Sequence, residues 1–137
     1  MLIIGFCGVG KTTYVSNHKN AIDLTCVEPG QLVLQEAISR FEIVLADPSW
    51  LMVFIESGLP FYVVVPSMDL KDEYLANYRE RHKRGTGGGD DRFCDFISGG
   101  WEEWIETLKK VNQTIVELGP GEWLEDAISY LSQSRNG

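Results

Sequence analysis

The chain has 137 residues, of which 44% are hydrophobic and 23% charged, and its net charge at pH 7 is −8. This length fits one domain with its own core, and this composition excludes an intrinsically disordered chain. The net negative charge argues against a protein that binds nucleic acid or anionic membranes over its whole surface, so a polyanionic ligand requires a local basic site.

Cysteines and apolar runs indicate the cellular setting. Cys7, Cys26 and Cys94 are widely spaced and lack metal-ligand spacing, which argues against both a disulfide framework and a zinc site. The first six residues are apolar but carry no basic leader, and no apolar run is long enough to cross a membrane. We therefore expect a single domain, residues 1–137, in the cytoplasm and without membrane association.

The first predicted strand, residues 2–5, leads directly into Gly5-Phe6-Cys7-Gly8-Val9-Gly10-Lys11-Thr12-Thr13. This segment fits the phosphate-binding pattern G-x-x-x-x-G-K-[ST], in which loop N–H groups surround phosphate oxygens, the lysine reaches the β- and γ-phosphates, and the next hydroxyl ligates Mg²⁺. A glycine-rich turn with a solvated lysine is the alternative. We predict a nucleoside triphosphate site, and the residues that we expect to contact the nucleotide are Gly5, Gly8, Val9, Gly10, Lys11, Thr12 and Thr13.

Strand-like and helix-like segments alternate along the rest of the chain, which predicts an α/β fold with a parallel sheet. Predicted strands are residues 2–5, 21–26, 42–46, 61–65 and 114–118. Predicted helices are residues 12–18, 29–41, 49–57, 69–83, 100–111 and 122–133. Residues 43–45 and 63–65 are continuously apolar, as is typical of strands that are covered on both faces.

Two aspartates follow or interrupt apolar strands. Asp23 lies within the predicted second strand, where a lone carboxylate is costly unless it faces a site. Asp47 directly follows an apolar strand, a position from which a carboxylate can reach a magnesium ion, although Asp47-Pro48-Ser49 is also a good turn or helix cap. We predict Asp23 as the base or acceptor-site residue, and Thr12 with Asp47 as the metal ligands.

The predicted helix 69–83 and the residues after it concentrate positive charge. Six of the twelve lysines and arginines of the chain lie between residues 71 and 92, and they are Lys71, Arg79, Arg81, Lys83, Arg84 and Arg92. They flank residues 85–91, where four glycines in five positions cannot hold a helix or strand and predict a mobile joint. This pattern favours a lid at about residues 70–98 whose arginines reach transferring phosphates, with local ion pairs on a solvated helix face as the alternative.

Tryptophans in the last two predicted helices repeat at helical spacing. Trp101, Trp104, Ile105 and Leu108 form one stripe. Trp123, Leu124, Ala127, Ile128 and Leu131 form the other. We predict that both stripes pack in the core, in preference to an aromatic platform for a substrate.

Several of these segments together resemble the P-loop kinases of nucleosides and nucleotides, and most closely their small bacteriophage members. That group includes deoxynucleotide or adenylate kinases and 5-hydroxymethyluracil DNA kinases. The resemblance spans nearly the whole chain, although only residues 5–13 are sharply diagnostic. Its other parts are Ile22-Asp23-Leu24, residues 59–66, Glu73-Tyr74-Leu75, residues 78–81, Phe96-Ile97 and residues 101–105.

The resemblance implies a three-layer fold with strand order 2-3-1-4-5 and helices on both faces of the sheet. It also implies ATP and Mg²⁺ as cofactors, Asp23 as the residue that contacts the acceptor hydroxyl, and Arg79, Arg81 and Arg84 as lid cations. This chain departs from the family in the short helix after Lys11 and in residues 27–41, where Arg40 is the only cation. A monophosphate acceptor usually needs more positive charge, so a nucleoside-like hydroxyl, including one on a base in DNA, remains open.

The leading hypothesis is an ATP-dependent phosphotransferase in which Lys11, Asp23 and the lid arginines are catalytic. Its acceptor is of nucleotide type, either a free nucleotide or nucleoside or a hydroxymethylated base in DNA, in the host cytoplasm if a phage encodes the protein. The alternative is a regulatory or interaction protein that binds nucleotide without transferring phosphate. The sequence does not indicate an oligomeric state.

Overall fold

The computed structural model describes the chain from residue 1 to residue 136, with side chains up to residue 133. Its five strands form one parallel sheet in the order β2-β3-β1-β4-β5, which confirms the predicted α/β class and strand order. The strands are β1 (Leu2–Gly5), β2 (Ala21–Asp23), β3 (Ile43–Ala46), β4 (Tyr62–Pro66) and β5 (Thr114–Leu118).

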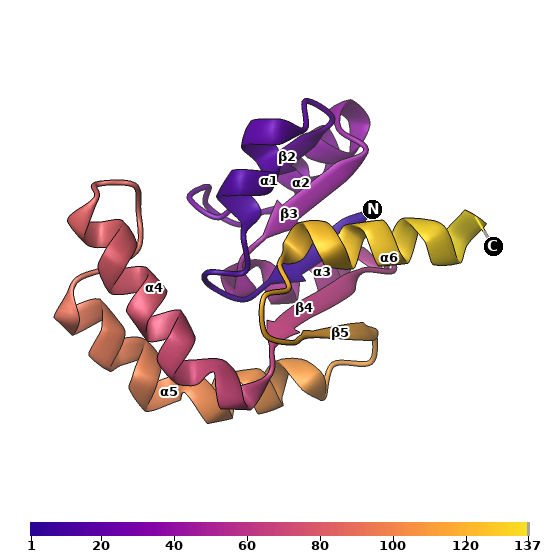
Figure 1. The fold of residues 1–137 in the computed structure, drawn as a ribbon. Helices are drawn as coiled ribbons and strands as arrows, with labels where there is room; N and C mark the ends of the chain where they lie inside the picture. Colours follow the sequence, from indigo (N-terminus) through magenta and orange to yellow (C-terminus); the bar gives the residue numbers. More distant parts are fainter. Residues whose placement is uncertain (137) are drawn as a thin grey trace.

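Six α-helices and two short 3₁₀ helices connect these strands within the described residues. The α-helices are α1 (Lys11–Asn17), α2 (Gln31–Arg40), α3 (Leu51–Ser57), α4 (Lys71–Lys83), α5 (Asp91–Lys109) and α6 (Leu124–Asn136). The 3₁₀ helices η1 (Pro48–Trp50) and η2 (Met68–Leu70) lead into α3 and α4. In Figure 1, α1 and α6 lie in front of the sheet and α3 lies behind it. Helices α4 and α5 form a hairpin whose far end projects away from the strands, while α5 also packs against β4.

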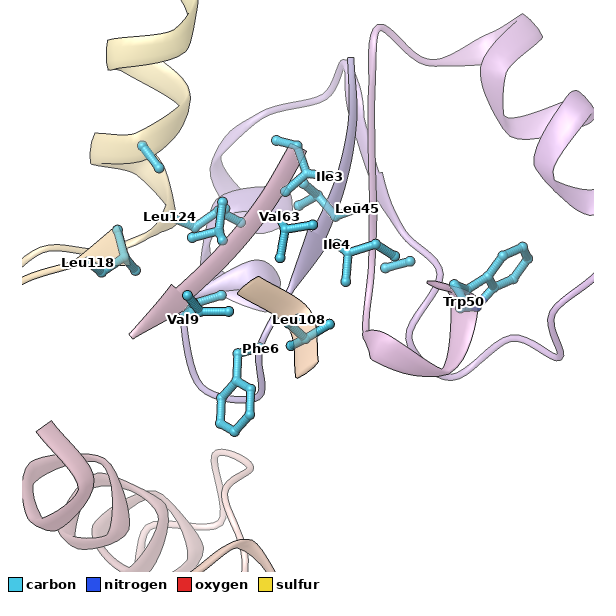
Figure 2. Close-up of a cluster of buried hydrophobic side chains, with 14 of the residues drawn as sticks. Ile3, Ile4, Phe6, Val9, Leu45, Trp50, Val63, Leu108, Leu118 and Leu124 are labelled. Atoms are coloured by element: carbon cyan, nitrogen blue, oxygen red, sulfur yellow. The ribbon is translucent and has the colours of Figure 1, made fainter. Parts of the chain in front are cut away.

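The central strands are buried because they carry apolar side chains on both faces. All four residues of β1 and of β3 are buried, and β3 and β4 occupy interior positions in the sheet, as their continuous apolar sequences predict. Figure 2 shows Ile3, Leu45 and Val63 of the central strands in one cluster with Leu124 of α6. Trp50 and Trp101 are fully buried, so Trp101 packs in the core as predicted.

Two predictions about helices are wrong in instructive ways. Helix α5 begins at Asp91, nine residues before the predicted start at residue 100, because the Asp90 carboxylate accepts a hydrogen bond from Phe93 N at 3.0 Å and caps the helix. Gly99 and Gly100 do not break this helix. A Cβ on Gly100 would lie 2.3 Å from Trp104 Cε2, so the missing side chain makes room for the indole.

The second wrong prediction concerns Trp123. Helix α6 begins at Leu124, and Trp123 precedes it with 41% of its surface exposed, whereas Leu124, Ala127, Ile128 and Leu131 are buried as predicted. Among the helices of residues 1–136, none combines the length and the apolar character that spanning a membrane requires.

Candidate functional site

The first glycine loop, residues 5–13, connects β1 to α1 at the carboxyl end of the central strand. Gly8 and Gly10 adopt φ angles of 89° and 108°, in the left-handed region that only glycine enters without strain. Val9 between them is fully buried, and its carbonyl accepts a 2.8 Å hydrogen bond from Leu124 N at the start of α6. Figure 2 shows Val9 in the cluster that also holds Leu118 and Leu124, so packing of Val9 in the core fixes the position of this loop.

Lys11 turns back into this loop, and only 7% of its surface is exposed. Its Nζ donates to Gly5 O at 2.6 Å and to Phe6 O at 3.2 Å, and it forms no ion pair with a carboxylate in the described part of the chain. Burial lowers the pKa of Lys11, and the charge of Asp23 opposes that shift more than the charge of Asp47 does. The structure therefore holds a buried ammonium that two carbonyls satisfy only in part.

Asp23 and Asp47 end neighbouring strands on one side of the first glycine loop. Asp23 Oδ1 accepts from Thr25 N at 3.0 Å and also from the Thr25 hydroxyl, so its carboxylate is held at the end of β2. Asp47 caps η1 by position, and its Oδ1 accepts from the Ser49 hydroxyl. Both carboxylates are partly exposed and available to a ligand, and the strands that carry them lie on the same side of β1.

Thr12, the other predicted metal ligand, is exposed in the first turn of α1. In the part of the chain that the structure describes, no group of three or more His, Cys, Asp and Glu side chains is arranged to hold a metal ion. Mg²⁺ in phosphate sites is usually bound through one or two protein oxygens together with phosphate oxygens and water. The Thr12 hydroxyl and the Asp47 carboxylate fit that mode of binding and would not hold the ion without phosphates.

Tyr78 of α4 joins the helical hairpin to the first glycine loop. Its hydroxyl donates to Cys7 O at 2.6 Å, and its ring covers Gly8 so closely that a Cβ there would lie 2.6 Å from Tyr78 Cε1. Burial raises the pKa of Tyr78, so the phenol remains a hydrogen-bond donor. Burial also raises the pKa of the Cys7 thiol, which the charge of Lys11 and the hydrogen bond to Tyr78 oppose.

A cleft of about 500 Å³ opens beside this contact, between α1, α4 and α6. Its walls are Gly8, Gly10, Thr13, Tyr14, Tyr74, Asn77, Tyr78, Glu80, Arg81, Arg84, Trp123 and Glu125. Aromatic rings from three helical regions and the glycines of the loop thus face one space, which suits a ligand with a flat apolar part and an anionic part.

Two aromatic residues of this cleft escaped the sequence analysis as site residues. Trp123 was predicted to lie in the core, but it lines the cleft with its ring centroid 6.2 Å from that of Tyr74. Tyr74 is 4% exposed, and its hydroxyl is the one buried side-chain polar atom without a hydrogen-bond partner among the described residues. Burial raises the pKa of Tyr74 to about 12. An unpartnered buried hydroxyl beside an open cleft fits a site whose ligand supplies the missing hydrogen bond.

The three predicted lid arginines occupy different surroundings. Arg81 and Arg84 line the cleft, whereas Arg79 lies on the other side of α4 and pairs with Asp91 of α5 at 3.2 Å. Arg84 also pairs with Glu80 at 3.0 Å, and Arg81 Nη2 donates to Thr86 O at 3.2 Å. The structure therefore brings two of the three arginines to the cleft, and local ion pairs hold Arg79 and Arg84.

The residues between α4 and α5 form neither helix nor strand, as predicted from their glycines. Gly89 N donates to Tyr78 O at 3.2 Å, and a Cβ on Gly88 would lie 2.2 Å from that same carbonyl oxygen. Here too the glycines allow a close backbone approach, so the turn packs against α4.

Comparison with protein-family models, curated proteins and solved structures gives no match.

Proposed function

We propose that this protein is an ATP-dependent phosphotransferase with a P-loop kinase fold, acting on a nucleotide-type acceptor. The observation that carries the proposal is the buried ammonium of Lys11 within a loop whose glycines adopt left-handed angles. A buried cation that only two carbonyls contact is costly, and the phosphates of a bound nucleotide would give it the negative partner that it lacks.

The surroundings of the loop support a nucleotide as the ligand. The phosphates would lie on the first glycine loop, and the base and sugar would extend into the cleft between Trp123, Tyr14 and Tyr74. Aromatic walls favour a flat base, and the unpartnered Tyr74 hydroxyl offers it a hydrogen bond. With Mg²⁺ bound, Thr12 and Asp47 would contribute ligands, and the ion would neutralise charge on the transferring phosphate.

Asp23 and the cleft arginines are suited to different parts of the transfer reaction. Asp23 lies at the end of β2, on the side of Lys11 where the acceptor would approach, and is suited to orient it. Arg81 and Arg84 approach from the opposite hairpin and are suited to stabilise negative charge on the transferring group.

Replacement of Lys11 tests this function. For Lys11→Ala we expect phosphoryl transfer from ATP to fall by a factor of about 10² to 10³, the loss usual when one strong donor to a developing oxyanion is removed. Lys19→Ala, an exposed lysine after α1, is the matched control and should retain its activity. Labelled γ-phosphate measures transfer, circular dichroism measures folding, and equal transfer by folded Lys11→Ala and wild type would refute the proposal.

ATP hydrolysis without a labelled acceptor is the outcome that favours the alternative. A nucleotide-binding regulatory protein would turn over ATP, or only bind it, across every acceptor offered. The same labelled ATP therefore separates the two functions when deoxynucleosides, deoxynucleotides and DNA are tested in parallel.

A further inference from the structure

The half of the molecule next to Asp23 is acidic. Between residues 20 and 70 the chain contains one arginine, Arg40, and no lysine. The same stretch carries the carboxylates Asp23, Glu28, Glu36, Glu42, Asp47, Glu56 and Asp69. Most of these carboxylates lie on or beside β2, α2, β3 and α3, and β2 and β3 occupy the same side of β1 in the sheet. Asp69 is the exception, because it follows β4 on the other side of β1.

Arg40 does not compensate this charge at the site. It occupies the last turn of α2, and α2 runs from the carboxyl end of β2 back to the amino end of β3, so Arg40 lies at the opposite edge of the sheet from Asp23. Its guanidinium also pairs with Glu36 at 3.3 Å. A ligand that approaches Asp23 from this side therefore meets no lysine or arginine in residues 20–70.

Hydrogen bonds hold the loops on this side of the site in place. The indole N–H of buried Trp50 donates to Leu24 O at 2.9 Å and to Val27 O at 3.2 Å, which fixes the loop after β2. Gln31 Nε2 donates to Val53 O at 2.8 Å and ties the start of α2 to α3. Exposed apolar side chains in these segments are Val27, Leu32 and Met52.

Phosphate and hydroxyl acceptors differ in what they need from such a site. A phosphate is already ionised at neutral pH, requires no base, and is repelled by carboxylates near the reacting oxygen. A hydroxyl is neutral and becomes a better nucleophile when a carboxylate accepts its proton. Asp23 and Asp47 follow or end the two strands on one side of β1, which leads into the first glycine loop, so they oppose the first kind of acceptor and suit the second.

We propose that the acceptor of this phosphotransferase is a hydroxyl on an uncharged group and not a phosphate. The inference rests on the proposed function and narrows its substrate class. The acceptor oxygen forms a bond to the γ-phosphorus while the bond from that phosphorus to the β,γ-bridging oxygen breaks, and ADP leaves with the electron pair. The hydroxyl proton passes to the Asp23 carboxylate and then to solvent, so the product is a phosphate monoester.

Parallel labelling of three acceptor sets tests the inference. The full-length protein is incubated with γ-labelled ATP and Mg²⁺, and with deoxynucleosides, deoxynucleoside monophosphates or duplex DNA that carries a hydroxymethyl pyrimidine. Label on a deoxynucleoside or on the DNA base supports the inference, and the arm that is labelled identifies the source of the hydroxyl. Label on a monophosphate, as a new phosphoanhydride, overturns the inference and leaves the phosphotransferase standing. Label on no acceptor overturns both.

Asp23→Asn sharpens the test on whichever acceptor is labelled. Asn keeps an oxygen for the hydrogen bonds from Thr25 but cannot take a proton. With a hydroxyl acceptor we expect kcat to fall by a factor of about 10² to 10⁴, the usual contribution of a general base. With a phosphate acceptor the change would leave kcat intact or raise it, because repulsion is relieved. Glu56→Gln, which removes the same charge from exposed α3, should leave kcat within a factor of two.

Discussion

The molecule contains two glycine-rich segments, the first glycine loop (residues 5–13) and the second glycine segment (Gly85–Gly89), and they serve different ends. The first lies on the core, with Val9 and Lys11 buried. In the second, residues 85–88 are exposed, and its glycines carry no motif. Both segments use left-handed angles, at Gly8 and Gly10 in one and at Gly85, Gly87 and Gly88 in the other. Glycine content alone therefore does not distinguish the two segments, whereas burial and the lysine do.

One residue contacts both segments. The Tyr78 hydroxyl bonds the first loop at Cys7 O, and the Tyr78 carbonyl accepts from Gly89 in the second segment. Any movement of the second segment along α4 is thus coupled through one residue to the loop that would hold phosphate. Alanine substitutions at the glycines that contact Tyr78 can therefore measure how the two segments differ.

Alanine at the close-contact glycines should produce the largest effects. Gly8→Ala places a Cβ 2.6 Å from the Tyr78 ring, and Gly88→Ala places one 2.2 Å from Tyr78 O, both at positive φ. We expect each to lower the free energy of unfolding by about 3 kcal/mol, which combines the cost of a left-handed alanine with a steric clash. Only Gly8→Ala should also weaken ATP binding by more than tenfold at a temperature where both variants are folded.

Gly85→Ala is the control for backbone strain without a clash. Gly85 has a φ of 68°, but nothing lies within 4 Å of an added Cβ. The expected loss is about 1 kcal/mol, the cost of the left-handed angle by itself. Urea denaturation of the three variants checks the order, and equal losses at Gly85 and Gly88 would show that close packing against Tyr78 contributes nothing.

How far the sequence predicts this architecture depends on whether a signal is local. The five parallel strands follow from apolar runs, and their order follows from a family resemblance. Trp123 was misplaced because the apolar spacing of α6 includes Trp123 as well as Leu124. Only the observed start of the helix, at Leu124, separates the two residues. The predicted helix 100–111 missed the first nine residues of α5, which begin at the cap that Asp90 provides.

Local sequence signals also predict only part of the candidate site. Helical spacing puts Arg81 and Arg84 on one face of the predicted helix and Arg79 on another, but only the structure shows that the first two line the cleft and that Arg79 pairs with Asp91. Tyr74 and Tyr78 lie in segments that carry the family resemblance, but nothing in the sequence marks them as site residues, because buried tyrosines on a helix usually pack in a core. Their different hydrogen-bonding states appear only once the loop and α6 are placed beside α4.

Substitutions of the three arginines should have effects of intermediate size on phosphoryl transfer, and the loss should be larger for Arg81 and Arg84 than for Arg79. For Arg81→Ala and Arg84→Ala we expect phosphoryl transfer to fall about tenfold each, since each removes a cation from the cleft, equivalent to about 1.4 kcal/mol. Arg79→Ala loses an exposed pair with Asp91, which is usually worth about 0 to 1 kcal/mol of stability, and should keep its transfer rate within a factor of two. Steady-state kinetics at constant ionic strength measure all three, and a tenfold loss at Arg79 would remove the distinction between the two sides of α4.

The smallest and most specific effects should come from the two tyrosines of α4. Tyr78→Phe deletes the hydrogen bond to Cys7 O, so we expect the free energy of unfolding to fall by about 1 kcal/mol. Tyr74→Phe deletes a buried hydroxyl that has no partner in the described structure, so the unliganded protein should be unchanged or more stable by a few tenths of a kcal/mol. The two variants are matched in chemistry, helix and burial.

Nucleotide binding should reverse the order of these two variants. If the ligand completes the hydrogen bond of Tyr74, Tyr74→Phe should bind ATP several-fold more weakly despite its intact stability, because about 1 kcal/mol of interaction is lost only in the complex. Thermal denaturation with and without ATP-Mg²⁺ measures both quantities in one experiment. A Tyr74→Phe protein that is less stable without ligand and equally stabilised by it would mean that the Tyr74 hydroxyl serves the fold and not the cleft. In that event Tyr78 would be the one of the two tyrosines whose hydroxyl contacts the site.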